Sequence, residues 1–243
     1  MQLPDNIFWF TLLSLLAEVL GTIGGFGSSL FFVPIAALFL DFHQVLGVTA
    51  LFHVFSNTSK IYYFRKGFNK KIMLELGISS VLFVILGAVC SKFLNTKILE
   101  LLLAIFLISI SVVLYFFQNI KLEVNTRNSV LGGATSGFIA GIVGTGGAIR
   151  GAVLSSYNLP KEIFISTSAF IDLATDSARG VVYYSEGYIT EELWVYIPVL
   201  LIVSIVGTYL GKILLQKISE TQFKKIVLLL VFATGLFSLI KTL

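Results

Sequence analysis

Seven ionisable side chains stand inside apolar stretches that are long enough to cross a lipid bilayer. They are Glu18, His53, Lys60, Arg150, Asp172, Asp176 and Arg179. A charge at the centre of a bilayer costs about 2.5 kcal/mol or more, so each group needs a partner or a water-lined cavity. Such groups mark ion pathways, proton relays and binding sites, and they are the candidates for chemistry in this chain.

Two segments carry polar side chains at the spacing i, i+3, i+4 and i+7, which places each set on one face of a helix. The sets are His53, Ser56, Asn57 and Lys60 in the first segment and Asp172, Thr175, Asp176 and Arg179 in the second. Their symmetry favours two polar stripes that face each other and build a site. The plainer alternative is helix packing through hydrogen bonds and an Asp176–Arg179 pair.

Two glycine-rich breaks interrupt apolar segments about 120 residues apart. The breaks read Gly21-Thr22-Ile23-Gly24-Gly25-Phe26-Gly27-Ser28-Ser29 and Gly141-Ile142-Val143-Gly144-Thr145-Gly146-Gly147. Each glycine weakens a continuous helix by about 1 kcal/mol relative to alanine, which favours a true break. A helix that restarts at membrane depth presents unpaired N–H groups and a partial positive charge, and this end suits an anion.

We predict that an anion is bound by the amides of both breaks and by nearby hydroxyl, amide and cationic side chains. The predicted binding residues are Gly24, Gly25, Gly27, Ser28, Asn57, Lys60, Thr145, Gly146, Gly147, Arg150 and Arg179. The carboxylates of Glu18, Asp172 and Asp176 are predicted to be either counter-ions for Arg150 or Arg179 or proton carriers. His53 either titrates near neutral pH or is a hydrogen-bonded packing residue.

Other glycines have the small-xxx-small spacing of closely packed membrane helices. Gly133, Gly137, Gly207 and Gly211 are the clearest examples, and we predict a packing role for them. Gly21 with Gly25 and Gly137 with Gly141 share this spacing but adjoin the breaks.

The sequence offers little support for other chemistry. No His, Cys or carboxylate set has metal-ligand spacing, and the glycines at 21 to 27 follow a membrane-length helix rather than the strand of a dinucleotide site. Neither a G-x-S-x-G nor an H-E-x-x-H motif is present. We therefore predict no cofactor, no metal and no enzymatic activity. The lone Cys90 excludes a disulfide within the chain.

The elements that must position these groups are transmembrane helices. Of 243 residues, 56% are hydrophobic and 12% are charged, against roughly 25% charged in a soluble domain. The apolar runs approach the roughly 20 residues that a spanning helix needs, and the first run is expected to be retained rather than cleaved as a signal peptide. The runs give eight segments: 7–40 (interrupted), 44–64, 72–91, 98–117, 129–157 (interrupted), 162–184, 192–214 and 222–240.

An internal duplication relates the halves 1–120 and 121–243. The loop 65–71 contains four basic residues, whereas its counterpart 185–192 contains no Lys or Arg. By the positive-inside rule the first loop is cytoplasmic and the second external. This requires an odd number of crossings per half, as when each broken segment is a hairpin that enters and leaves on one side. We predict an all-α polytopic membrane protein of two inverted repeats, each a hairpin plus three transmembrane helices.

The duplicated glycine motifs resemble those of the sulfite exporter TauE/SafE family of membrane permeases. The resemblance covers nearly the whole chain and rests on the motifs Gly24-Gly25-Phe26-Gly27 through Val33-Pro34 and Gly144-Thr145-Gly146-Gly147. It implies a transporter for small sulfur-containing or carboxylated anions, such as sulfite, thiosulfate and organosulfonates. The second half departs from the pattern because no proline stands at the position equivalent to Pro34 and because Arg150 lies close to the break. An arginine fork can bind two oxygens of a sulfonate.

We therefore expect a permease for a small anion in the plasma membrane of a prokaryote. The anion would bind between the repeats and cross by alternating access. An anion channel is the first alternative and an intramembrane enzyme the weaker one. The expected partners are the anion, the lipid bilayer and, as one option for a coupling ion, protons; nucleic acid is not expected. The coupling ion and the oligomeric state stay open, with a homodimer as one option.

Overall fold

The structure is a computed structural model that describes residues 6–25, 27–116, 123–217 and 220–242. Phe26 of the first break lies outside these residues. The described chain is almost entirely helical and contains no strand, which confirms the prediction of an all-α polytopic membrane protein. The helices are α1 (Ile7–Gly24), α2 (Ser29–Ala36), α3 (Phe42–Tyr63), α4 (Lys70–Ser91), α5 (Thr96–Phe116), α6 (Thr126–Val143), α7 (Gly147–Ser155), α8 (Lys161–Ser185), the 3-10 helix η1 (Glu191–Val195), α9 (Tyr196–Leu215) and α10 (Glu220–Thr242).

Four described segments are long and apolar enough to cross a membrane, namely α1, α4, α5 and the continuous η1–α9 segment Glu191–Leu215. α10 contains the shorter apolar stretch Leu228–Thr242. Ile78 and Leu82 on α4 and Ile202 on α9 are each more than half exposed, as side chains that face lipid are. α3 and α8 are also long, but their polar stripes lower their hydropathy, and they pack against each other.

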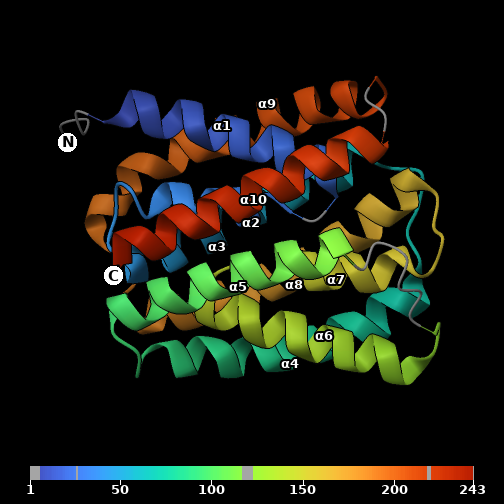
Figure 1. Cartoon of the computed structure of the whole chain (residues 1–243), viewed down its shortest axis with the longest axis horizontal. Coiled ribbons are helices and arrows are strands. Elements are labelled where there is room, and N and C mark those ends of the chain that lie inside the picture. Colours follow the sequence, from blue (N-terminus) through green and yellow to red (C-terminus); the bar gives the residue numbers. More distant parts are fainter. Residues whose placement is uncertain (1–5, 26, 117–122, 218–219, 243) are drawn as a thin grey trace.

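The helix order of the first half recurs in the second. α1 to α5 contain 18, 8, 22, 22 and 21 residues, and α6 to α10 contain 18, 9, 25, 20 and 23. α1 packs along α9 and α4 packs along α6, while α3 contacts α8 and α5 contacts α10. These four contacts are therefore the same when the first five helices are exchanged for the last five. α5 and α10 run in opposite directions along the long axis (Figure 1).

Each broken segment ends its first helix on a left-handed glycine. The cap of α1 is Gly25 with φ 69°, and the cap of α6 is Gly144 with φ 80°. Their N–H groups donate to Gly21 O at 3.2 Å and to Ala140 O at 3.0 Å. A side chain with a Cβ pays about 1–2 kcal/mol in this conformation, so glycine stops the helix cleanly. The two predicted breaks are confirmed.

The other predicted packing glycines lie on two helix seams. A Cβ at Gly133 or Gly137 on α6 would lie 2.3 Å from a backbone oxygen of α4. A Cβ at Gly207 or Gly211 on α9 would lie 2.8 or 2.7 Å from a side chain of α1. These helices can approach closely only because the glycines have no side chain, which confirms the packing role.

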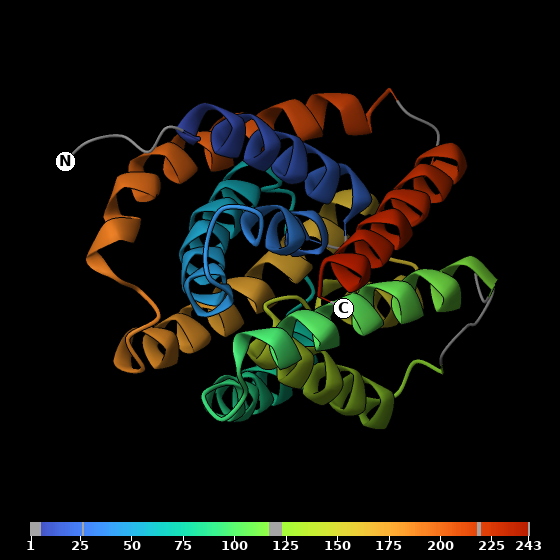
Figure 2. The same cartoon turned by 60° about the vertical axis from the view of Figure 1, so that its left-hand side comes forward.

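The short helix α2 is enclosed by longer ones. It contacts α1, α3 and α10, and Figure 2 shows it inside the molecule between them. Aromatic rings fill the space around it, with Phe32 of α2 centred 6.0 Å from Phe10 of α1 and 4.5 Å from Phe52 of α3. This packing holds the N-terminus of α2 deep in the protein, where the candidate site lies.

Candidate functional site

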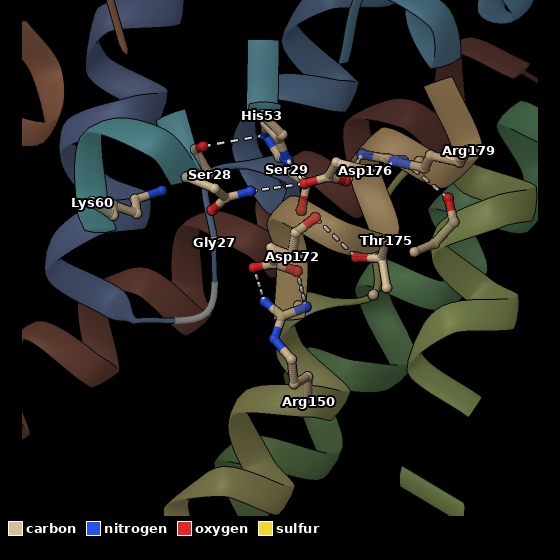
Figure 3. A pocket seen from close by; sticks show the side chains of 15 residues that line it. Gly27, Ser28, Ser29, His53, Lys60, Arg150, Asp172, Thr175, Asp176 and Arg179 are labelled. Carbon is tan, nitrogen blue, oxygen red and sulfur yellow. Dashed lines mark hydrogen bonds and ion pairs between the residues drawn. The ribbon is translucent and has the colours of Figure 1, made fainter. Parts of the chain in front are cut away.

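The N-terminal ends of α2 and α7 face one small buried cavity (Figure 3). Its volume is about 20 Å³, which is room for about one water molecule. The first break, α3, the second break with α7, and α8 all contribute to its wall. The lining residues are Gly27, Ser28, Ser29, His53, Asn57, Lys60, Ala140, Gly144, Gly146, Gly147, Arg150, Asp172, Thr175, Asp176 and Arg179.

Both breaks offer helix N-termini to this cavity. The first N–H groups of any helix have no acceptor within the helix, and the helix dipole adds partial positive charge there. Ser28 is the N-cap residue of α2, and Gly146 is that of α7. Thr145 Oγ1 donates to Ser29 Oγ at 3.0 Å, so a hydrogen bond joins the two breaks directly. The site is thus built where two positive helix ends meet.

The polar stripes of α3 and α8 meet beside these helix ends. Asn57 Nδ2 donates to Asp176 Oδ2 at 2.8 Å, and His53 Nδ1 lies 3.8 Å from the same oxygen. The prediction that the two stripes face each other is confirmed by these contacts. All three side chains are buried, so the hydrogen bond and the His53 contact are made away from bulk water.

Arg179 connects α8 to the end of α6. Its Nε and Nη2 lie 2.8 and 2.7 Å from Asp176 Oδ1, and its Nη1 donates to Ala140 O at 3.0 Å. Ala140 stands in the last turn of α6, where the helix dipole favours a positive charge. Tyr183 Oη adds a hydrogen bond to Gly141 O at 2.7 Å. The predicted Asp176–Arg179 pair is therefore present, and it also holds the broken helix in place.

Arg150 reaches from α7 to α8. Its guanidinium forms a two-pronged ion pair with the carboxylate of Asp172, and its Nε donates to Ser168 Oγ at 3.0 Å. Figure 3 shows the guanidinium pointing from α7 toward Asp172 at the cavity. The planar fork is shaped to bind two oxygens of one oxyanion, and a carboxylate of the protein occupies it here.

Glu18 has a different partner from the one predicted. The expectation of a counter-ion for Arg150 or Arg179 is wrong for this residue, because Glu18 Oε1 lies 3.1 Å from Lys60 Nζ. Glu18 lies on the side of α1 that faces α3 and α9, whereas carboxylates on α8 engage both arginines. The side chain of Glu18 is fully buried and reaches the cavity wall through Ser28, whose Oγ donates to it at 2.6 Å.

The charges of the site are balanced in pairs. Lys60 with Glu18, Arg150 with Asp172, and Arg179 with Asp176 make three ion pairs, all largely or fully buried. In the structure each cation already has a carboxylate, so an anion competes with these carboxylates or requires one more positive charge.

Most of the predicted residues line this cavity, and a few do not. Gly25 lines a smaller neighbouring cavity and Thr145 contributes through Ser29, whereas Gly24 lines neither cavity. The predicted set lacked Ser29, Thr175, Ala140 and Gly144, which line the main cavity. Ser29 and Thr175 belonged to the recognised patterns. Ala140 contributes its backbone carbonyl, which the type of its side chain does not indicate. Only its position four residues before Gly144 would have indicated this role.

Buried charges around two broken helices, inside a shell of apolar helices, are features of membrane transporters. Residues 10–238 match the family described as "Sulfite exporter TauE/SafE". The chain belongs to this family of membrane transporters. It is 29% identical over 248 residues to a protein of Methanocaldococcus jannaschii named "Probable membrane transporter protein", with 91% of each chain covered. No solved structure matches the chain.

Proposed function

We propose that this transporter carries a small oxyanion, either a sulfur oxyanion, an organosulfonate or a related carboxylate, across the plasma membrane of a prokaryotic cell. The observation that carries the proposal is the meeting of the α2 and α7 N-termini at one buried cavity beside Arg150. Backbone N–H groups at helix N-termini and an arginine fork are the donors that oxyanions prefer.

The bound anion would replace protein oxygens that occupy these donors. Its oxygens would take the place of Asp172 at Arg150 and would accept from amides of Ser29 and Gly147. The cavity has room for about one water, so an oxyanion needs the two helix ends to move apart. Binding of the anion would therefore be accompanied by movement of α2 and α7.

Alternating access would follow from the duplication. We propose that 1–120 and 121–243 are inverted repeats and that one part of each repeat moves against the rest. The exchangeable packing of the halves and the opposite directions of α5 and α10 support this reading. The cavity lies where both repeats contribute a helix end, so it stays central while each side opens in turn.

Thermal unfolding in detergent with a panel of anions tests the proposal. The panel is sulfite, thiosulfate, sulfoacetate, taurine, acetate, phosphate and chloride. A specific ligand at 100 times its dissociation constant is expected to stabilise the protein by about 2.7 kcal/mol. Selective stabilisation by one sulfur oxyanion, sulfonate or carboxylate would support the proposal, and a protein that responds to none of them would contradict it.

A double substitution shows whether the response belongs to the cavity. Arg150→Gln with Asp172→Asn removes both charges of one pair, so the net charge stays the same while the fork is lost. The matched control is Lys66→Gln with Glu162→Gln, which removes the exposed Lys66–Glu162 pair. Only the first variant is expected to lose the stabilisation. Saturable uptake by proteoliposomes would separate a transporter from an anion channel, whose flux would not saturate.

A further inference from the structure

His53 lies between two carboxylate systems at the cavity wall. Its Nε2 is 3.2 Å from Ser28 Oγ, and its Nδ1 is 3.8 Å from Asp176 Oδ2. The side chain is only 7% exposed, and Figure 3 shows the ring placed between Ser28 and Asp176. Its two ring nitrogens therefore have different and fixed surroundings.

The hydroxyl of Ser28 decides which nitrogen carries a hydrogen. Ser28 Oγ donates to Glu18 Oε2 at 2.6 Å, and Lys60 Nζ lies 3.1 Å from the other oxygen, Glu18 Oε1. Ser56 and Thr208 also donate hydroxyl hydrogens to Glu18, at 2.7 and 2.9 Å. Since Ser28 has one hydroxyl hydrogen and gives it to Glu18, it can only accept from His53. The hydrogen of the neutral imidazole is thus on Nε2.

The other nitrogen then turns a lone pair toward a carboxylate. Asp176 Oδ2 already accepts from Asn57, and Oδ1 accepts from Arg179, so donors engage both oxygens of this carboxylate. A lone pair that faces a carboxylate is repulsive, whereas an added proton on Nδ1 makes an imidazolium–carboxylate pair. We propose that the His53–Asp176 pair binds the proton that is carried together with the anion.

The charges around His53 explain why the proton and the anion would bind together. With neutral His53 the ion pairs balance, and one proton gives the site a net charge of +1. The cations repel that proton while the cavity is empty, and a bound anion removes the repulsion. The titratable and charged groups that face His53 are Glu18 on α1 (through Ser28), Lys60 on α3, Arg150 on α7, and Asp172, Asp176 and Arg179 on α8.

This inference rests on the proposed function, and linkage makes it measurable. If one proton is taken up with each anion, each favours the binding of the other equally. The dissociation constant of thiosulfate or sulfoacetate, whose own charge is constant near neutrality, should fall about tenfold per pH unit of acidification. His53→Gln keeps a donor for Ser28 but has no second site for a proton. Its affinity should stay at the weak, high-pH value throughout.

Nuclear magnetic resonance of the purified protein labelled with 15N-histidine gives a direct view, because the sequence contains only two histidines. The second, His43, lies in the first turn of α3, with its Nδ1 3.6 Å from Asp41 Oδ1. It provides an internal control. We expect thiosulfate or sulfoacetate to convert His53 from the Nε2–H form to the imidazolium while His43 is unchanged. His43→Gln should keep the full pH dependence of binding.

The outcomes separate this inference from the function on which it rests. Anion binding with a flat pH dependence, and a His53 that stays neutral in the complex, would overturn proton coupling and leave the anion transporter standing. Absence of anion binding at every pH would overturn the proposed function and the coupling with it. A His53 with its hydrogen on Nδ1 would contradict the inferred direction of the hydrogen bonds, whatever binds.

Discussion

Glu18 shows how a single buried charge can be stabilised by several helices. Its carboxylate is contacted by Ser28 of α2, Ser56 and Lys60 of α3, and Thr208 of α9. An ionised carboxylate accepts about four hydrogen bonds, and here they come from every helix around it. A charge that would be costly in lipid therefore joins four helices at one point.

Replacing Glu18 by Gln should destabilise the protein more than any other single change at this point. The amide would turn hydrogens toward Lys60 and the hydroxyl donors, and Lys60 would become an uncompensated buried charge. The expected cost is about 3–5 kcal/mol, measured by thermal unfolding in detergent. Lys60→Met should cost less because the hydroxyl donors to Glu18 remain.

The double variant Glu18→Gln with Lys60→Met provides the control. The two residues contact each other, so the double variant should lose less stability than the sum of the single losses. Additive losses would mean that the two charges do not interact in the folded protein.

At the scale of residues, spacing predicted which side chains meet but not which pairs form. The i, i+3, i+4 and i+7 patterns placed Asn57 and Asp176 on facing stripes, and these two are hydrogen-bonded. The partner of Glu18 could not be predicted, because Glu18 is the only charged residue of α1 and the rotation of α1 against α3 depends on tertiary packing. Lys60 belonged to a stripe, yet its ammonium turns toward α1.

The seam between α4 and α6 shows what the glycines do for a pair of helices. A Cβ at Gly137 would lie 2.3 Å from Ser80 O and 2.8 Å from Ser80 Cα, which are backbone atoms that cannot turn away. Gly77 on α4 is also buried and helical, but its added Cβ would meet only a methylene of Ile171 at 3.6 Å. The chain thus contains two similar glycines in different surroundings.

Gly137→Ala should destabilise the protein, whereas Gly77→Ala should not. The first forces α4 and α6 apart, at an expected cost of about 1–3 kcal/mol. The second substitution makes only an ordinary van der Waals contact. It is expected to leave the stability unchanged or to increase it by up to about 1 kcal/mol. Unfolding temperatures of the two variants in one detergent would test this, and equal losses would contradict the packing role of Gly137.

At the scale of elements, the sequence predicted the breaks well because glycine clusters act locally. Gly25 and Gly144 adopt left-handed φ angles because glycine has no Cβ, and this effect does not depend on tertiary packing. The lengths of α2 and α7, at 8 and 9 residues, were harder to predict because the apolar runs continue past their ends. The hydropathy of those runs carries no signal for where a buried half-helix stops.

The whole molecule has two chemically different ends. In Figure 1 the loop between α8 and η1 lies at the end where α1 begins and α10 finishes, and the basic loop between α3 and α4 lies at the opposite end. Lys92 and Glu186 form an ion pair of 2.8 Å at the first end. The hydrogen bond from Lys92 to Glu186 raises the pKa of Lys92, so as the pH rises Lys92 keeps its charge further into the alkaline range than a free lysine does.

The positive-inside rule then predicts which end faces the cytoplasm. Lys70 and Ser185 are exposed residues beside these two loops, one at each end of the molecule. In a Cys90→Ser background, Ser185→Cys should react with a membrane-impermeant thiol reagent added to intact cells. Lys70→Cys should react only after the cells are opened. The reverse pattern would contradict the proposed orientation.

At the scale of the molecule, the sequence predicted a helical membrane protein. The apolar core and the thickness of a bilayer determine the composition and the length of the apolar runs, whatever the tertiary packing. The packing of α1 of the first half along α9 of the second, and of α4 along α6, could not be predicted. Hydropathy does not indicate which apolar helix faces pack against each other. The close approach of Gly207 to α1 could have been inferred only as packing against some helix.

The packing of helices from one half against helices of the other also affects the order of assembly during synthesis. α1 leaves the ribosome first, yet α9, along which it packs, begins only at Tyr196. Until then the carboxylate of Glu18 lacks its contact with Thr208, and α1 lacks the helix along which it packs. α4 waits for a shorter time, because α6 begins at Thr126. α1 is therefore synthesised well before the helix along which it packs, and its packing is completed only after α9 has been made.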